Sequence, residues 1–209
     1  MVAAVLELLR SPALTLWGVD VAWSEVAGDL TGAACVWLVA RQHVANWPLG
    51  LANNLFWALL FVDAKLYGDA VLQGVFFALG VYGWWLWVRG DGGGEPLRVR
   101  GTAAREWGVL ATATALSTVL AHHWLDRWTD SPVPLWDATV LTLSLLATWG
   151  QANKRIESWW VWIAVDVISV PLYVSRGLYP TAALYVVFGA LCVVGLRDWS
   201  RARAAEVPA

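Results

Sequence analysis

Long apolar stretches separated by short polar segments run through most of the chain. A helix that crosses a bilayer needs about 20 mostly apolar residues, with a lower limit near 17. Reading the chain with this length gives seven candidates, at roughly 24–41, 47–63, 69–88, 103–121, 136–151, 159–175 and 178–197. The pattern therefore predicts an all-α integral membrane protein with seven transmembrane helices.

The segments outside these stretches are short, apart from two. Residues 1–23 place Glu7 and Arg10 within a short apolar stretch and lack a basic start followed by a small-residue cleavage site. We therefore expect a short helix on or near the membrane surface rather than a cleaved signal peptide. The second exception is the polar, glycine-rich segment 89–102, which we interpret as a linker.

Composition supports the bilayer as the solvent of this protein. Hydrophobic residues make up 59% of the chain and charged residues 14%, and the mean hydropathy is +0.56. The net charge of −2 without a run of like charges argues against a nucleic-acid partner. Cys35 and Cys192 each lie in an apolar stretch, where a thiol behaves as a small hydrophobe. We therefore expect neither a disulfide framework nor a zinc site.

The positions of Arg and Lys predict the orientation in the membrane. If the loop after the first span is cytoplasmic, only Arg10, Lys65, Arg127 and Arg176 lie outside, and the other Arg and Lys residues lie inside. Cytoplasmic loops are enriched in these residues. The N-terminus is then outside and the C-terminus is in the cytosol.

The chain also resembles itself at one constant shift in numbering. The segment that starts at Leu66 aligns without gaps on the segment that starts at Leu178. We term this shift of 112 residues (178 minus 66) the repeat offset. The identical pairs at the repeat offset include Trp37 with Trp149, Trp47 with Trp159, Tyr67 with Tyr179, Phe76 with Phe188, Gly83 with Gly195 and Trp87 with Trp199. Spans one to three therefore match spans five to seven.

This repeat predicts an architecture. Three spans are an odd number, so the fourth span is needed to give both copies the same direction. The result is two parallel three-helix repeats joined by a linking helix (3+1+3), which is the arrangement of SWEET transporters, with substrate near the midplane. The predicted segments are a surface segment (1–23), a first bundle (24–88), a polar linker (89–102), a linking helix (103–121), a second bundle (134–199) and a cytosolic tail (200–209).

Five motifs carry a resemblance to a known family. They are NWPLGLANN from Asn46, LYGDAVLQ from Leu66, YGWWLW from Tyr82, PLWDA from Pro134 and IESWWVWIAVDVIS from Ile156. With these motifs the chain resembles the PnuC family of nicotinamide riboside transporters, bacterial relatives of the SWEETs, over about 25–88 and 134–199. The resemblance implies the 3+1+3 topology, a homotrimer with one pathway per subunit, and facilitated diffusion in the cytoplasmic membrane, drawn inward by phosphorylation of the riboside. The family often has Asn where this chain has Asp166, and similar relatives carry thiamine or riboflavin, so these vitamins remain alternatives.

Nicotinamide riboside has a cationic aromatic ring, a carboxamide and a ribose, which call for aromatic faces and amide groups in its site. The substrate-binding candidates at membrane depth are Asn53 and Gln73 as hydrogen-bonding groups, Trp84, Trp159 and Trp162 as stacking walls, and Asp166. An ionised Asp166 could balance a pyridinium or thiazolium charge, and a protonated one could donate a hydrogen bond. The alternatives are amides that join helices, tryptophans that anchor the membrane interface, and an Asp166 that pairs with a structural neighbour.

Other polar residues predict no further chemistry. We place His122, His123 and Asp126 in a solvated outer loop without a matching second pair for a metal. Asp29 and Asp137 fit positions at helix N-termini. No nucleophile with its base and no carboxylate pair stands out, so we expect neither an enzyme nor a cofactor. A membrane-embedded enzyme and a small-molecule receptor that transports nothing remain the alternatives from other classes.

Overall fold

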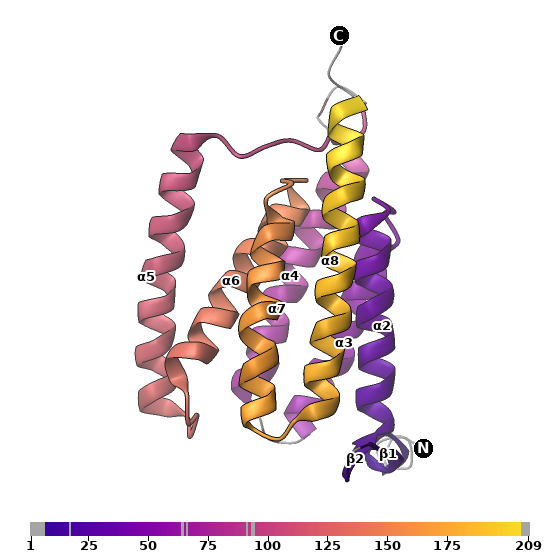
Figure 1. Ribbon diagram of the computed structural model, residues 1–209, viewed down its shortest axis with the longest axis vertical. Coiled ribbons are helices and arrows are strands. Elements are labelled where there is room, and N and C mark those ends of the chain that lie inside the picture. The colour runs from indigo at the N-terminus through magenta and orange to yellow at the C-terminus, as the bar shows by residue number, and fades with distance from the viewer. Residues whose placement is uncertain are drawn as a thin grey trace.

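A computed structural model describes residues 7–16, 18–63, 65, 67–90, 92 and 95–205. The chain is mostly helical (Figure 1). The helices are α2 (Trp23–Ala40), α3 (Asn46–Asp63), α4 (Tyr67–Arg89), α5 (Ala104–Trp128), α6 (Pro134–Ala152), α7 (Ser158–Ser175) and α8 (Tyr179–Ala205). A two-stranded antiparallel sheet, β1 (Pro12–Leu16) and β2 (Val19–Ala22), precedes them.

Two helices run further than the apolar stretches predict. Helix α5 continues to Trp128, so His122, His123 and Asp126 lie on a helix and the outer-loop prediction for them is wrong. Helix α8 continues to Ala205, so most of the predicted tail is helical. Hydropathy marks where a bilayer ends, whereas a helix continues as long as residues such as Ala, Leu and Arg favour it.

The N-terminal segment also differs from the prediction. Residues 7–10 are helical, but a β-hairpin follows them where a surface helix was expected. Gly18 adopts a φ of 80° at the turn, and the Thr15 hydroxyl donates a hydrogen bond to Asp20 at 2.6 Å. Such a turn favours a hairpin because glycine adopts positive φ without a steric penalty. Residues 1–6 of this predicted segment lie outside the described residues.

Six of the helices form a closed ring. Going around it, α2 packs on α3, α3 on α4, α4 on α6, α6 on α7, α7 on α8, and α8 returns to α2. Helix α5 stands to one side of the ring and packs on α6 (Figure 1). The hydroxyls of Thr118 on α5 and Thr142 on α6 are hydrogen-bonded at 2.6 Å.

Contacts recur around this ring at the repeat offset. A β-carbon on Gly83 would lie 2.2 Å from the Trp47 ring, and one on Gly195 would lie 2.4 Å from the Trp159 ring. The absent side chain of each glycine therefore makes room for an indole from a neighbouring helix. Both pairs join the second and third helix of their repeat.

Four indoles form what we term the tryptophan cluster: Trp47, Trp87, Trp159 and Trp199. Trp47 and Trp87 meet edge to face with centroids 5.5 Å apart, and Trp159 and Trp199 do so at 5.4 Å. Trp87 and Trp199 connect the two pairs at 6.3 Å. Edge-to-face contacts suit aromatic rings because the positive edge of one ring meets the negative face of the other.

The two halves also exchange equivalent hydrogen bonds beside this cluster. The Trp87 indole donates to the carbonyls of Gln151 and Ala152, at 3.3 and 3.2 Å. The Trp199 indole donates to the carbonyl of Val39 at 3.1 Å. Since the repeat offset carries Trp87 onto Trp199 and Val39 onto Gln151, each half holds the other in the same way.

A third exchange lies at the helix ends beside the cluster. Gln42 and Lys154 are also equivalent at the repeat offset, and both have positive φ, at 54° and 47°. The Lys154 ammonium donates to the Gln42 side-chain oxygen at 2.8 Å and lies 4.6 Å from the centre of the Trp87 ring. This end of the bundle is thus joined across the two halves by side chains at matching positions.

The segment between α4 and α5 is attached to the same end of the bundle. Arg100 pairs with Arg155 in an isolated parallel bridge, and its N–H donates to the Lys154 carbonyl at 3.0 Å. The Arg155 side chain binds the Gly101 carbonyl and the Glu106 carboxylate, both at 2.7 Å. We term residues 98–102 the strap, since they tie the start of α5 to the turn between α6 and α7.

The outer surface is apolar, as a lipid environment requires. Leu30, Val71, Leu120 and Val167 are each about two-thirds exposed on different helices. By length and composition alone, three described helices are apolar enough to cross a membrane, at Asp69–Arg89, Ser158–Ser175 and Tyr179–Ala205. Without lipid, so much exposed apolar surface would be unfavourable.

Candidate functional site

Helix α7 carries three of the predicted site residues. Trp159 is completely buried in the tryptophan cluster, with its ring against Gly195. Trp162 is half-buried and packs on the same core. Neither indole N–H finds a hydrogen-bond partner among the described residues. The contacts of Trp159 favour a packing role, whereas Trp162 lies between this core and Asp166 along the helix.

Asp166 is the most unusual polar residue at membrane depth. It is 5% exposed, and its Oδ2 has no hydrogen-bond partner in the part of the chain that the structure describes. A β-carbon on Gly189 of α8 would lie 3.7 Å from this oxygen, and the Cys192 thiol lies beside the carboxyl group. A buried carboxylate oxygen without a donor is costly, which makes this position a candidate for ligand binding.

Asn53 on α3 binds the neighbouring helix. Its amide donates to the Gly28 carbonyl at 3.1 Å and to the Thr31 hydroxyl at 2.5 Å, both on α2. These bonds occupy the amide N–H groups, so the structure agrees with the alternative that Asn53 joins two helices. The next residue, Asn54, is the one that the repeat offset carries onto Asp166.

Gln73 and Trp84 both lie on α4 but in different surroundings. Gln73 is half-buried. Trp84 is 39% exposed, and none of the described ring or hydrogen-bond contacts joins it to the other candidates. The structure therefore brings Trp159, Trp162 and Asp166 together on one helix and leaves Trp84 apart from them.

Two tyrosines near Asp166 were missed by the sequence reasoning. Tyr173 on α7 and Tyr185 on α8 have ring centroids 5.0 Å apart, and Tyr185 also meets Phe188 edge to face at 5.8 Å. Tyr185 lies one turn along α8 from Gly189, the residue that faces Asp166. The repeat contains the signal that would have found it, because the repeat offset carries the predicted site residue Gln73 onto Tyr185.

Asp29 differs from its predicted role. Helix α2 begins at Trp23, so Asp29 lies in its second turn rather than at its N-terminus. Asp137, by contrast, lies in the first turn of α6, and Arg176 binds its carboxylate at 3.3 Å. Among the residues that the structure describes, no group of three or more His, Cys, Asp or Glu side chains is placed to hold a metal ion.

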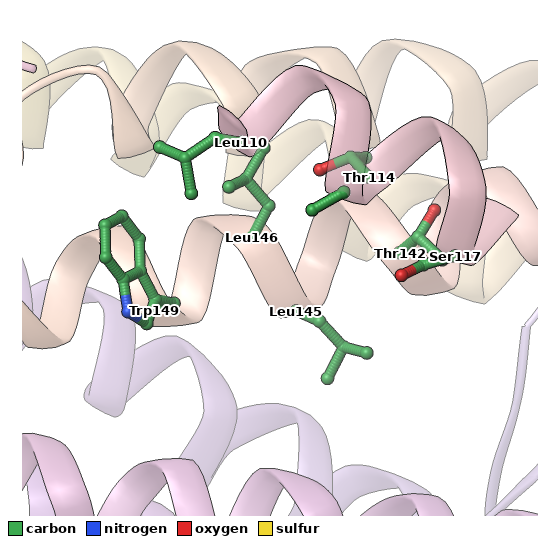
Figure 2. A pocket seen from close by; sticks show the side chains of 8 residues that line it. Leu110, Thr114, Ser117, Thr142, Leu145, Leu146 and Trp149 are labelled. Carbon is green, nitrogen blue, oxygen red and sulfur yellow. The ribbon is translucent and has the colours of Figure 1, made fainter. Parts of the chain in front are cut away.

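Two grooves between helices lie away from these residues. One is a cavity of about 200 Å³ between α5 and α6. Figure 2 shows Leu110 and Trp149 at one end of it and Thr114, Ser117 and Thr142 at the other. The second groove, between α7 and α8, is lined by apolar residues and by Tyr179. Neither groove contains a predicted site residue.

Comparison with known proteins identifies the family. The sequence model described as nicotinamide mononucleotide transporter matches residues 22–201, which is most of the chain. This chain belongs to that transporter family. The helices, the apolar surface and this membership together make it a multi-pass membrane protein of the PnuC type.

Curated relatives of this family carry two different vitamins in their names. The chain is 27% identical over 207 residues to the nicotinamide riboside transporter PnuC of Escherichia coli, covering 87% of both proteins. It is 30% identical over 197 residues to the riboflavin/roseoflavin transporter RibM of Streptomyces davaonensis, covering 91% of both.

A solved structure shows the same fold. The crystal structure of a vitamin B3 transporter PnuC aligns with a TM-score of 0.72 at 21% identity, over 88% of this chain and 83% of the other. At this identity the match extends to the fold and not to the ligand. The resemblance inferred from the motifs is confirmed at the level of the family.

Proposed function

We propose that this protein carries nicotinamide riboside across the bacterial cytoplasmic membrane by facilitated diffusion, with a site between its two three-helix halves. The observation that carries the proposal is the reciprocal set of contacts between the halves at the repeat offset. Two similar halves that face each other can enclose a solute at the midplane and open to either side by rocking.

The direction of uptake follows from metabolism in this proposal. The described spans contain no evident pair of acidic groups with a partner cation that would couple an ion, so the substrate equilibrates passively. Phosphorylation of the riboside in the cytosol then traps it. The tryptophan cluster lies at the cytosolic end if the N-terminus is outside, and the functional unit is a homotrimer with one pathway in each subunit.

Riboflavin is the second candidate substrate. The specific observation in its favour is the match to RibM, which covers 91% of both chains at 30% identity. Riboflavin and nicotinamide riboside share a planar heteroaromatic ring and a chain of sugar hydroxyls. A site for one therefore needs much of the chemistry of a site for the other.

Flux into proteoliposomes tests the proposal. We expect labelled nicotinamide riboside to equilibrate across the membrane without a gradient, and to accumulate only when a riboside kinase and ATP are inside. Riboflavin and thiamine tested in parallel identify the vitamin. Binding without flux would indicate a receptor, and accumulation of unmodified substrate driven by a proton gradient would contradict passive transport.

Replacement of Asp166 tests the site. We expect Asp166→Ala to weaken vitamin binding about tenfold or more, because a charge-assisted hydrogen bond contributes roughly 1.5–3 kcal/mol. Asp126→Ala is the matched control, since this carboxylate is exposed on α5 outside the ring. Unchanged binding by a folded Asp166→Ala protein would remove this residue from the site.

A further inference from the structure

Helices α2 and α8 run side by side in the same direction (Figure 1). The Trp199 indole meets the Val39 carbonyl at one level, and Phe188 lies against Gly32 at another, 3.5 Å from where a β-carbon would be. The difference in residue number between the two partners is nearly the same for both contacts. The two helices therefore stay level with each other along their length. One turn further along both helices, this register places Asp29 level with Tyr185.

A second carboxylate reaches the same place from α7. Asp166 faces Gly189, one turn along α8 from Tyr185, with its Oδ2 3.7 Å from the position of the absent β-carbon. The Tyr185 ring meets Tyr173 and Phe188, with centroids 5.0 and 5.8 Å apart. Since Asp166 is buried and its Oδ2 has no hydrogen-bond partner among the described residues, this oxygen has hydrogen-bonding capacity that the protein itself does not use.

The equivalent positions in the other half have different chemistry. At the repeat offset, Tyr185 corresponds to Gln73 of α4 and Asp166 to Asn54 of α3. Asp29 corresponds to Leu141 of α6. At these positions the second half offers a carboxyl and a phenol oxygen where the first half offers amides, and Asp29 of the first half adds its carboxyl group from α2, which packs on α8.

Carboxylates accept hydrogen bonds through two oxygens, which matches a pair of neighbouring hydroxyl donors. Acidic side chains bind ribose hydroxyls in this way in dinucleotide-binding proteins. We propose that Asp29, Asp166 and Tyr185 form a subsite for the sugar hydroxyls of the transported vitamin, and that Asn54 and Gln73 face its heteroaromatic ring. This inference rests on the proposed function and deepens it, because it assigns the residues that bind each part of the substrate.

Calorimetry on the purified protein with paired ligands tests the subsite. Nicotinamide riboside is compared with 1-methylnicotinamide, which keeps the positive ring and lacks the sugar. Riboflavin is compared with lumiflavin, which lacks the ribityl chain. We expect Tyr185→Phe and Asp29→Asn each to weaken binding of the sugar-bearing ligand about tenfold. Binding of the truncated ligand, measured by competition, should change less than twofold.

The controls separate the subsite from the proposed function. Tyr179→Phe alters an exposed tyrosine on the same helix and should leave all affinities unchanged. An equal loss for 1-methylnicotinamide would show that the carboxylates bind the ring charge, and unchanged binding of the sugar-bearing ligand in both variants would show that the residues have no role. Either result overturns the subsite alone. A wild-type protein that binds neither vitamin overturns the proposed function and the subsite together.

Discussion

Single glycines determine how closely the helices of each half approach. Gly83 and Gly195 lie against the faces of Trp47 and Trp159, at distances that leave no room for a methyl group. In lipid, helices associate through close packing more than through hydrophobic burial, so small residues at such contacts contribute much of the stability.

Gly195→Ala should therefore destabilise the protein. The added methyl group would lie 2.4 Å from the Trp159 ring, and overpacking of this kind costs about 1–3 kcal/mol. Thermal unfolding in detergent measures the effect. Gly74→Ala is the matched control, because nothing lies within 4 Å of its β-carbon position and alanine favours a helix. Equal unfolding temperatures in the two variants would contradict the packing role.

At the residue scale, the sequence predicts how deep a side chain lies in the membrane better than it predicts which neighbour the side chain faces. Asp166 was selected because a carboxylate lies within an apolar stretch, and the structure shows it buried with an unpaired oxygen among the described residues. Asn53 met the same criterion but binds α2, and Tyr185 was overlooked because a tyrosine in a span is unremarkable by composition. Which neighbour a side chain meets depends on the rotation of its helix, and apolar residues on all sides leave that rotation undetermined.

At the scale of elements, the two halves are joined by bonds that each provides to the other. Trp87 and Trp199 both donate to a backbone carbonyl at the end of the first helix of the opposite half. These bonds lie beside the turns at Gln42 and Lys154, where both residues have positive φ. In the proposed transport cycle, this is the end that has to separate when the pathway opens to the cytosol.

Trp199→Phe should loosen this end. The substitution keeps an aromatic ring in the cluster but removes the N–H that binds Val39, at a cost of about 1–2 kcal/mol. We expect a lower unfolding temperature and, in flux assays, faster exchange where opening limits the rate. Trp128→Phe is the control, since this indole is 76% exposed at the end of α5. A Trp199→Phe protein as stable as the control would mean that the bond contributes nothing.

Most elements could be predicted from hydropathy, and the departures have a common cause. Each of the seven apolar stretches coincides with a described helix. The errors lie where the chain leaves the apolar region: α5 and α8 continue past it, and the hairpin replaces the expected surface helix. Outside lipid, local turn chemistry and helix propensity decide the structure, and a hydropathy scale measures neither.

At the scale of the whole molecule, the hairpin and the end of α8 lie at opposite ends of the bundle (Figure 1). This arrangement agrees with an odd number of crossings. The orientation itself stays a prediction from the Arg and Lys residues, with the hairpin outside and the end of α8 in the cytosol.

Cysteine labelling in intact cells tests this orientation. In a protein whose Cys35 and Cys192 are replaced by alanine, we expect Leu14→Cys to react with an impermeant maleimide from outside. Arg201→Cys should react only after the membrane is permeabilised; both positions are exposed. Labelling of both from the same side would exclude the seven-span topology. The cysteine-free parent, without either substitution, gives the background.

The strap has a mechanical consequence. Because Arg100 binds the turn between α6 and α7, and Arg155 binds the start of α5, these bonds hold the strap to the second half. We therefore expect the protein to tolerate a break in the chain before the strap. Cutting the gene there should give two fragments that reassemble when co-expressed. A cut at Gly101 would instead separate Arg100 and its hydrogen bonds from the second fragment.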